Sequence, residues 1–354
     1  MGKIRFGVVG TNFITDWVIA GAKEDSRFCL AAVCSRTQER GEEFAAKYNI
    51  PHVFTSLEAM VASDCIDAVY IASPNFKHAE QSILAMSHGK HVLCEKPLAA
   101  NAREARAMIE ASEKYGVTLM EAMKSTLSPN FRRVMDNLHR IGTPRRYFAS
   151  FCQYSSRYDR FKQGELLNAF NPAVANGAAM DIGVYTIYPL IRLFGKPHTI
   201  NAQGIILSSG TDGQGAVNML YEGMNATILY SKIANSSLPA EIEGEDGNIT
   251  IDRIQTPAKV EFHPRQAPAS GHEKVVVPTS LSIEDKHNEY YYEIAEFIDL
   301  IESGRRESAI NTHATSLHTI EVLDEIRRQM GVRFPSDEAV HRGGSASCCS
   351  RSTS

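Results

Sequence analysis

A lysine stands where an apolar run meets a proline in the stretch CEKPLAANAREA, residues 94–105. Pro97 disfavours helical backbone at Lys96, so the chain stays extended and the lysine side chain points out of the end of a strand. An ordinary surface cation is the alternative, because most lysines are solvated. A lysine held in this way can donate a hydrogen bond to a carbonyl oxygen, or exchange a proton with it. Lys96 is therefore a candidate acid–base residue.

A carboxylate and a phenol lie four residues apart in NGAAMDIGVYTIYPL, so Asp181 and Tyr185 share one face of a predicted helix. The alternative is a buried tyrosine that is simply hydrogen-bonded to an aspartate. Tyrosine and lysine have reference pKa values of about 10 and about 10.4, so base catalysis near neutrality requires one of them to be lowered. We expect a neighbouring ammonium group to favour the phenolate of Tyr185. Whether Tyr185 or Lys96 carries the proton stays open, and Asp181 would orient either the reacting hydroxyl or the Lys96 ammonium.

The elements that position Lys96 alternate between strand and helix from Lys3 to about Met123. Short β-branched runs alternate with stretches whose apolar residues recur every three or four positions. This alternation predicts an α/β fold with a doubly wound parallel sheet, a Rossmann domain over residues 1–123. The six expected strands are IRFGVVG, FCLAAVCS, HVFT, DAVYIAS, HVLCE and TLMEAM.

The pattern changes over residues 124–338, where we predict a C-terminal α+β domain with a large open, mostly antiparallel sheet. A polar loop, residues 155–177, leads to the helix of Asp181, and two helices end the fold. Helices on one face only would leave the other face for a homodimer or homotetramer. The Ser- and Gly-rich residues 339–354 are expected to be a disordered tail. Three turn dipeptides are predicted in the sheet, Asp212-Gly213, Glu222-Gly223 and Asp246-Gly247.

The first strand leads into GVVGTNFIT, where a tight turn and a helix N-terminus can bind a pyrophosphate. Aligned as GxGxxG from Gly10, the turn is degenerate, with Asn12 at the second glycine and Thr15 at the third. Asparagine is tolerable at that position because it accepts left-handed backbone better than most residues. The candidate dinucleotide contacts in this turn are Gly10, Thr11, Asn12, Phe13 and Ile14.

The end of the second strand, VCSRTQER, indicates which nucleotide binds. An NAD enzyme usually has an acidic residue there, whereas the 2′-phosphate of NADP needs cations or hydroxyls. Ser35, Arg36 and Arg40 precede or surround the first carboxylate, Glu39, so NADP is favoured, with NAD as the alternative. The ends of the fourth and fifth strands add further candidates at the same edge, namely Ser73, Pro74, Asn75, His78, Glu95 and Lys96; a solvated histidine is the alternative for His78.

The composition excludes several classes of protein. A formal net charge of -4 argues against a nucleic-acid binder. The N-terminus lacks a signal-peptide pattern and no run of 18 apolar residues is present, which favours a cytoplasmic protein without a membrane partner. No metal-ligand spacing is found, so no metal is expected. Cys29, Cys34, Cys65, Cys94 and Cys152 are isolated and are expected to be reduced, buried thiols.

Taken together, these motifs resemble the Gfo/Idh/MocA family of oxidoreductases from Lys3 to about Phe334. The resemblance rests on the first turn, the PNxxH segment at residues 74–78, the EKP at residues 95–97 and the helix of Asp181. Tyr185 stands where many members have the histidine of DxGxH, as in the branch of glucose-fructose oxidoreductase and dimeric dihydrodiol dehydrogenase. Residues 119–131 resemble the latter, although Lys124 and Ser125 replace an expected tryptophan-containing segment. CQYSSRY, residues 152–158, resembles an uncharacterised bacterial subgroup.

The resemblance implies hydride transfer between NADP and a carbinol or carbonyl carbon of a sugar, polyol or diol. It implies Lys96, Asp181 and Tyr185 as the catalytic residues. Arg157, Tyr158 and Arg160 in the polar loop are candidate substrate contacts, with a solvated loop as the alternative. A non-catalytic dinucleotide sensor with the same fold is the competing function. The intact set of three reactive side chains argues against it.

Overall fold

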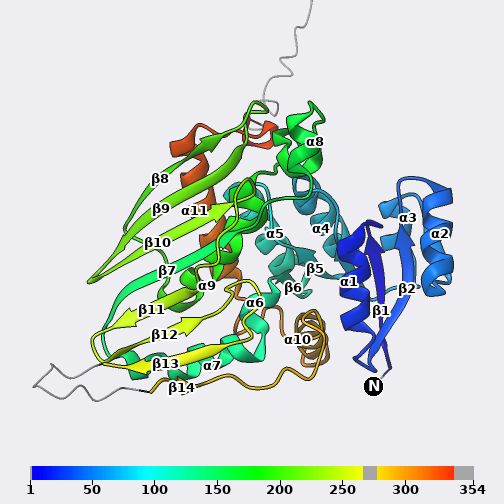
Figure 1. Cartoon of the computed structure of the whole chain (residues 1–354). Coiled ribbons are helices and arrows are strands. Elements are labelled where there is room, and N and C mark those ends of the chain that lie inside the picture. Colours follow the sequence, from blue (N-terminus) through cyan, green and yellow to red (C-terminus); the bar gives the residue numbers. More distant parts are fainter. Residues whose placement is uncertain (1, 266–276, 339–354) are drawn as a thin grey trace, which may run out of the picture.

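The computed structural model of the chain describes residues 2–265 and 277–338. Two β-sheets lie side by side with helices between them, the first sheet blue to cyan and the second green to yellow in Figure 1. The predicted tail and the pair Cys348 and Cys349 fall outside the described residues.

The first sheet has six parallel strands in the order β3-β2-β1-β4-β5-β6. All six strands predicted from the sequence are present. The strand order reverses between β1 and β4, which is where open α/β sheets bind their ligands. The strands are β1 Ile4–Val9, β2 Phe28–Cys34, β3 His52–Phe54, β4 Ala68–Ile71, β5 His91–Glu95 and β6 Leu119–Ala122.

Polar caps delimit the helices that connect these strands. Asn12, Thr37, Ser56 and Asn101 each accept a backbone N–H bond at the start of a helix. Such a cap satisfies one of the helix's unpaired donors and is worth about 1 kcal/mol. The helices are α1 Phe13–Ala22, α2 Gln38–Tyr48, α3 Leu57–Ala62, α4 His78–Ser87 and α5 Ala102–Tyr115.

The second sheet has eight strands in the order β14-β13-β12-β11-β7-β10-β9-β8. It is antiparallel except where β7 pairs with β10 in parallel, so the predicted mostly antiparallel sheet is confirmed. The strands are β7 Pro144–Cys152, β8 Thr199–Ile206, β9 Asp212–Tyr221, β10 Met224–Ser231, β11 Ala240–Gly244, β12 Gly247–Ile251, β13 Val260–Pro264 and β14 Thr279–Ser280.

Two of the three predicted turns are confirmed. Glu222-Gly223 is the two-residue loop between β9 and β10, and Asp246 lies in the loop between β11 and β12. The third prediction is wrong: Asp212-Gly213 begins β9, and the turn comes before it, where the Leu207 N–H donates to the Thr211 carbonyl. Asp212 is buried and accepts a bond of 2.7 Å from the Ala179 N–H. Its carboxylate therefore binds the start of the helical segment that contains Asp181 and does not stabilise a turn.

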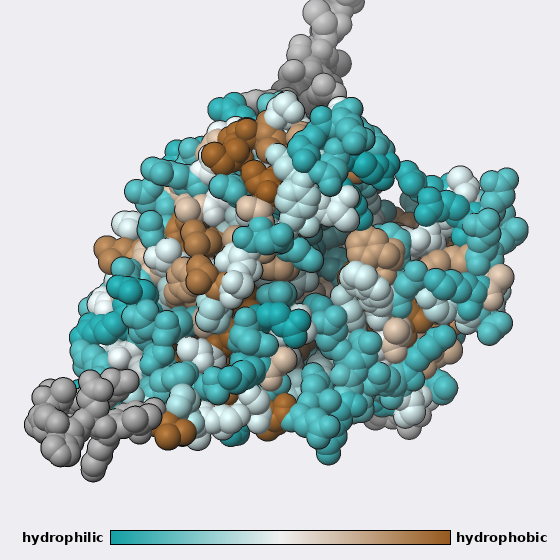
Figure 2. Space-filling view, in the orientation of Figure 1, coloured by the Kyte–Doolittle hydropathy of each residue, from teal (hydrophilic) through white to brown (hydrophobic). Residues whose placement is uncertain are grey.

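Helices cover one face of the second sheet. α9 Val184–Phe194 and α11 His313–Met330 pack there, and α11 also packs against α5 of the first sheet. Three shorter helices complete the second region, α6 Lys124–Leu127, α7 Pro129–Asn137 and α8 Tyr158–Lys162. No helix of the described residues covers the opposite face of the sheet, which shows brown apolar patches among teal polar groups in Figure 2.

Helix α10, Tyr291–Glu302, returns to the first sheet although it follows the second in the chain. The Phe297 ring lies 5.9 Å from the Phe6 ring of β1, and both side chains are fully buried. A Cβ at Gly21 of α1 would come within 2.8 Å of the Tyr290 backbone, so α1 and α10 pack closely. Residues 124–338, predicted from the sequence as one domain, therefore contribute one helix to the core of the first region.

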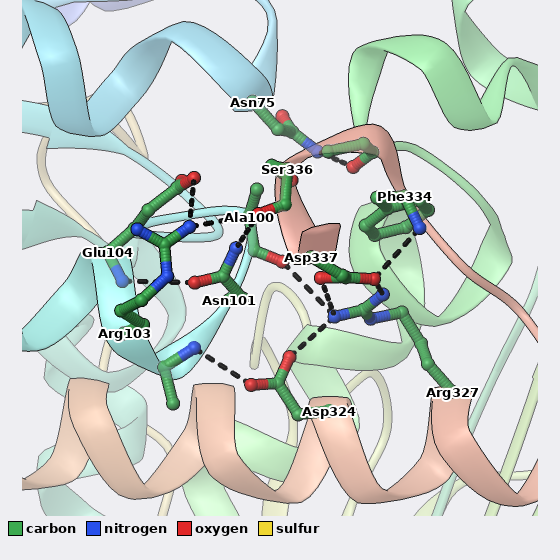
Figure 3. A network of polar contacts seen from close by, with 12 residues as sticks. Asn75, Ala100, Asn101, Arg103, Glu104, Asp324, Arg327, Phe334, Ser336 and Asp337 are labelled. Atoms are coloured by element: carbon green, nitrogen blue, oxygen red, sulfur yellow. Dashed lines mark hydrogen bonds and ion pairs between the residues drawn. The ribbon is translucent and has the colours of Figure 1, made fainter. Parts of the chain in front are cut away.

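A buried ionic group, the Arg327 latch, ties α11 to the start of α5 (Figure 3). It consists of Arg327, Asp324 and Asp337, with Arg327 nitrogens 2.6 Å from Asp324 and 2.8 Å from Asp337. Backbone groups complete it, because the Ala102 N–H donates to Asp324 and the Phe334 N–H donates to Asp337, both at 2.8 Å. The latch thus joins the two regions through paired charges, although Arg327 Nε has no hydrogen-bond partner among the described residues.

Candidate active site

The turn after β1 is fastened to the end of β4. Gly10 has a φ of +104°, and a Cβ there would lie 2.7 Å from the Ala72 carbonyl oxygen, so the turn requires glycine. The Asn12 amide donates to the same carbonyl at 3.0 Å, and its oxygen accepts from the Ile14 N–H at 2.9 Å. Asn12 has extended backbone with φ of -97°, which corrects the expectation that it is there for left-handed geometry. It serves as the N-cap of α1.

The end of β2 lies beside this turn, because the Gly10 N–H donates to the Cys34 carbonyl. Ser35 is buried, whereas Arg36 and Arg40 are exposed at the start of α2. Phe13, at the first position of α1, is 48% exposed. The predicted 2′-phosphate residues and the predicted pyrophosphate turn therefore share one edge of the sheet.

His78 is enclosed rather than solvated, with 1% of its surface exposed. Its Nδ1 lies 3.0 Å from the Pro97 carbonyl oxygen and its Nε2 lies 2.9 Å from that of Ser73. Burial lowers its pKa, which favours the neutral ring. The structure thus places His78 between the loops that follow β4 and β5, where it holds Ser73 and Pro97 in position.

Two other predicted residues lie around Lys96. The Asn75 amide donates to the Ala175 carbonyl at 2.8 Å, which links the loop after β4 to the segment before the Asp181 helix. Glu95 is buried and accepts bonds from the Tyr70 hydroxyl at 2.6 Å and the Lys96 N–H at 3.2 Å. Burial raises the pKa of Glu95. Glu95 therefore fixes the backbone of Lys96 by accepting its N–H bond.

The three predicted catalytic residues come together. The Lys96 ammonium lies 2.7 Å from the Asp181 carbonyl oxygen, 3.2 Å from its Oδ1, and 4.9 Å from the centre of the Tyr185 ring. Lys96 precedes a cis peptide bond to Pro97. Asp181 lies in a single π-helical stretch, Ala179–Gly183, ahead of α9, a distortion that is frequent at functional sites. Asp181 contacts the Lys96 ammonium, as one of its two predicted roles requires, and both roles stay predictions.

A second lysine completes this group, and sequence reasoning missed it. The Lys232 ammonium lies 2.5 Å from Asp181 Oδ2 and 3.0 Å from the Ala169 carbonyl oxygen, over the Phe170 ring. Its side chain is 4% exposed, and it follows the end of β10 in the sequence YSKIANS. A lysine directly after an apolar strand was the same signal that singled out Lys96. We name Lys96, Asp181, Tyr185 and Lys232 the Asp181 cluster.

The charges and burial in the cluster shift the pKa values of Asp181 and Tyr185 in opposite directions. Burial would raise the pKa of Asp181, but the ammonium groups of Lys232 and Lys96 outweigh it and hold the pKa well below its usual value. For Tyr185, burial and the charges of Glu95, Glu293 and Asp181 raise the pKa well above its usual value. The carboxylates around Tyr185 thus oppose the expected phenolate, so that Asp181 is an anion and Tyr185 a neutral phenol near neutral pH.

The three predicted loop contacts have separate places. The Arg157 guanidinium lies over the Phe13 ring at 5.3 Å, at the turn after β1. Tyr158 packs against Phe170, 5.6 Å between ring centres, and so borders Lys232. Arg160 is exposed and pairs with Glu165. The structure brings Arg157 and Tyr158 toward the site and leaves Arg160 at the surface.

Other features of the described residues lie away from this edge. A shallow cavity lined by Arg5, Asp64, Asp67, Lys90 and His91 lies at the opposite end of the parallel strands. Within residues 2–265 and 277–338, no three His, Cys, Asp or Glu side chains gather as metal ligands, and no helix is long and apolar enough to cross a membrane. All five cysteines in these ranges are free thiols. Cys34 and Cys94 are buried as expected, and the other three are half-exposed.

Comparison with known families decides the class of protein. Residues 4–123 match the model described as the oxidoreductase family with an NAD-binding Rossmann fold, and residues 132–250 match the GFO/IDH/MocA C-terminal domain. The chain belongs to the GFO/IDH/MocA family. It is an NAD(P)-dependent oxidoreductase, as the sequence motifs predicted.

Its relatives match over nearly their full length. A scyllo-inositol 2-dehydrogenase (NADP(+)) of Bacillus subtilis is 51% identical over 336 residues, 95% of this chain and 100% of the relative. A trans-1,2-dihydrobenzene-1,2-diol dehydrogenase of Mus musculus is 29% identical, over 95% of this chain and 98% of the relative. The crystal structure of a 3-ketoreductase from Actinomadura kijaniata, in complex with NADP and TDP-benzene, has a TM-score of 0.77 at 25% identity. It covers 93% of this chain and 98% of that one.

Proposed function

We propose that the protein transfers a hydride between NADP and a carbinol or carbonyl carbon of a sugar, polyol or diol, with cyclic polyols of the inositol type first among these. The observation that carries the proposal is the Asp181 cluster, which sets a neutral phenol and an ammonium group side by side at the ligand edge of the parallel sheet. The 51% identity to an inositol dehydrogenase named for NADP(+) supports the substrate class and the cofactor.

The chain's own residues supply the proton chemistry. When NADP is bound, it supplies or accepts the hydride. In the direction of reduction, the carbonyl oxygen gains negative charge, and Tyr185 can donate the proton because its raised pKa keeps it neutral. The Lys96 ammonium, fixed by two oxygens of Asp181, stabilises the developing alkoxide. In the direction of alcohol oxidation, Tyr185 must first lose its own proton, and its phenolate then takes the hydroxyl proton as the hydride leaves the carbinol carbon.

We assign the cofactor to the edge formed by the ends of β1, β2, β4 and β5. The required Gly10 and the capped N-terminus of α1 fit a pyrophosphate. Ser35, Arg36 and Arg40 fit a 2′-phosphate, since Arg36 and Arg40 are exposed beside the turn. Arg157, which lies over Phe13, is placed to contact the dinucleotide as well as a substrate. The nicotinamide end would lie near Ser73, Pro74, Asn75 and Lys96.

The cofactor assignment is tested by dissociation constants for NADPH and NADH, measured by fluorescence quenching. We expect the wild type to prefer NADPH. Arg36→Ala should weaken NADPH binding and leave NADH binding nearly unchanged, because only the former has the 2′-phosphate. Arg328→Ala, a change at an exposed arginine of α11, is the control. Equal affinities of the wild type for both nucleotides would contradict the NADP assignment.

The reaction is tested by NADPH oxidation with a panel of carbonyl compounds that includes keto-inositols, aldoses and diketones. We expect turnover with cyclic keto-polyols and its loss in Lys96→Ala. A protein that binds dinucleotide but turns over no member of the panel in either direction would favour the non-catalytic sensor instead.

We also propose that the uncovered face of the second sheet forms a homodimer. Outward-facing positions on four adjacent strands carry apolar side chains, and two of them, Ile205 and Leu220, are more than half exposed at 51% and 52%. Light scattering after gel filtration should give twice the chain mass, and Leu220→Glu should give the monomer. A monomeric wild type would contradict this proposal, and a tetramer would require a second interface. The other apolar residues of this face are Phe148, Ala216 and Leu229.

A further inference from the structure

Lys232 is the most deeply buried cation at the site. Its side chain is 4% exposed, compared with 12% for Lys96, and its ammonium contacts a carboxylate and a backbone carbonyl. A buried ammonium group is costly unless it is paired and hydrogen-bonded. Lys232 meets that condition only through Asp181 and the Ala169 carbonyl. Its environment therefore depends on the same carboxylate that holds Lys96.

The two carboxylate oxygens of Asp181 have different partners. One carboxylate oxygen accepts from Lys96 and the other accepts from Lys232. Two ammonium groups thus share this one carboxylate, and Glu95 and Asp212 are further acidic groups close to them. An ammonium group stabilises an alkoxide that forms beside it, because the site's low polarity strengthens the interaction.

We propose that Lys232 is a positioning residue for the hydride-transfer reaction, which keeps Asp181 ionised and oriented so that Asp181 can hold the Lys96 ammonium toward the reacting oxygen. The inference rests on the proposed function and assigns Lys232 no contact with substrate. Through the Ala169 carbonyl and the Phe170 ring, Lys232 also anchors the polar loop that carries Arg157 and Tyr158. Positioning of the cluster and positioning of the loop thus depend on one side chain.

The charges around Asp181 determine the expected pH behaviour. In the wild type, the two ammonium groups hold the pKa of Asp181 well below its usual value, so Asp181 stays ionised through the acidic range. Removing Lys232 leaves burial opposed by Lys96 alone, and the pKa of Asp181 must rise. Protonated Asp181 holds Lys96 poorly, so activity should fall at acidic pH first. The charged and titratable groups that face Asp181 are Lys96, Lys232 and Tyr185, with Asp212 close to Lys232 and Glu95 close to Lys96.

The test is the pH profile of kcat and kcat/KM for Lys232→Met, which retains the packing over Phe170 but removes the charge and both hydrogen bonds. We expect kcat to fall about 10²-fold, the usual cost of a misplaced catalytic group. The acidic limb of kcat/KM should move to higher pH, while the dissociation constant for NADPH stays unchanged. Lys232→Arg, which retains the charge, should restore most of kcat and the wild-type acidic limb. Lys259→Met, at an exposed lysine directly before β13, is the matched control.

Two results would overturn the inference: full activity in Lys232→Met, or an equal loss at every pH that Lys232→Arg does not relieve. If Lys232→Met fails to fold, Lys232→Gln carries the same test, because its amide can still donate to Ala169 but has no charge, and the acidic limb must again move upward. The two proposals fail in different ways. A wild type without turnover contradicts the proposed function, whereas an active wild type with an unaffected Lys232→Met contradicts this inference alone.

Discussion

The Asp181 cluster and the Arg327 latch contain the same kinds of charged group in opposite proportions. In the cluster, two ammonium groups share one carboxylate, whose side chain is 30% exposed. In the latch, two carboxylates share one guanidinium, whose side chain is 4% exposed. Backbone N–H groups of Ala102 and Phe334 supply the additional donors that the latch carboxylates need.

The surplus charge is therefore treated differently in the two groups. In the latch, fixed backbone donors bind the surplus of acid, and the group holds the two regions together. In the Asp181 cluster, two ammonium groups share one carboxylate at the predicted ligand edge, where they can stabilise a negative charge that develops during reaction. The two groups thus differ in which kind of charge is in excess and in what compensates that charge.

The largest expected effect is the loss of catalysis in Lys96→Met. Removing a positioned acid–base or electrostatic group should lower kcat/KM by about 10²- to 10⁴-fold. Asp181 keeps Lys232 as its partner, so the free energy of unfolding should change far less than it does when the latch is broken. Steady-state kinetics and urea unfolding measure the two quantities, with Lys259→Met as control. If Lys96→Met instead loses stability and keeps its activity, the Asp181 cluster is the structural group and not the reactive one.

Next in size is Arg327→Met, which leaves Asp324 and Asp337 without their cation. Breaking a buried ion pair in this way typically costs about 3–5 kcal/mol of unfolding free energy. Activity per folded molecule should be retained, because the latch does not contact the cluster. The neighbouring Arg328→Met removes an exposed pair with Glu325 and should change the unfolding free energy by less than about 1 kcal/mol. Similar losses of unfolding free energy in Arg327→Met and Arg328→Met would show that the buried latch stabilises the protein no more than the exposed pair does.

A third test concerns Glu121, a buried carboxylate of β6 that accepts the Leu98 N–H at 2.9 Å. Burial raises its pKa from 4.5 to about 7. The folded state therefore holds this proton more tightly than the unfolded state, and stability declines as the pH rises from about 4.5 through about 7. Glu121→Gln should remove this decline and gain about 3 kcal/mol on the wild type between those limits.

Urea unfolding of wild type and Glu121→Gln at pH 4.5 and pH 8 measures the difference. Glu113→Gln, at an exposed position of α5, controls for the loss of one charge. A constant difference between wild type and Glu121→Gln at the two pH values would show that Glu121 is compensated as the latch carboxylates are.

The smallest effect is expected for Asn75→Ala, which removes the neutral bond to the Ala175 carbonyl beside the latch (Figure 3). A neutral hydrogen bond contributes about 1 kcal/mol. We expect a loss of that size, together with faster amide hydrogen exchange over residues 171–177. Asn137→Ala removes a bond made within α7 and should leave exchange in that segment unchanged. Unchanged exchange in Asn75→Ala would show that the bond from Asn75 to Ala175 does not help to hold the two regions together.

The sequence predicted what depends on local pattern. The six parallel strands, the turn at Gly10 and the pairing of Lys96 with Asp181 followed from strand periodicity, from the motifs and from the resemblance to a known family. Contacts between distant segments were not predictable in this way. Lys232 lies 51 residues from Asp181, and its place after an apolar strand does not show which residue it contacts. Asp212-Gly213 has the composition of a turn, but it begins β9, and the Asp212 carboxylate accepts a hydrogen bond from the distant Ala179 N–H. Likewise, the raised pKa of Tyr185 depends on carboxylates that only folding brings near.

The return of α10 to the first sheet has a consequence for how the chain is made. Phe297 and Ile294 fill the core against β1, and this helix emerges from the ribosome only after the whole second sheet has been synthesised. Domains that are continuous in the chain can fold as soon as they are complete during synthesis. Here the dinucleotide-binding half must wait for nearly the entire polypeptide. A nascent chain arrested before residue 291 should therefore lack a finished cofactor domain, although all six of its strands are already present.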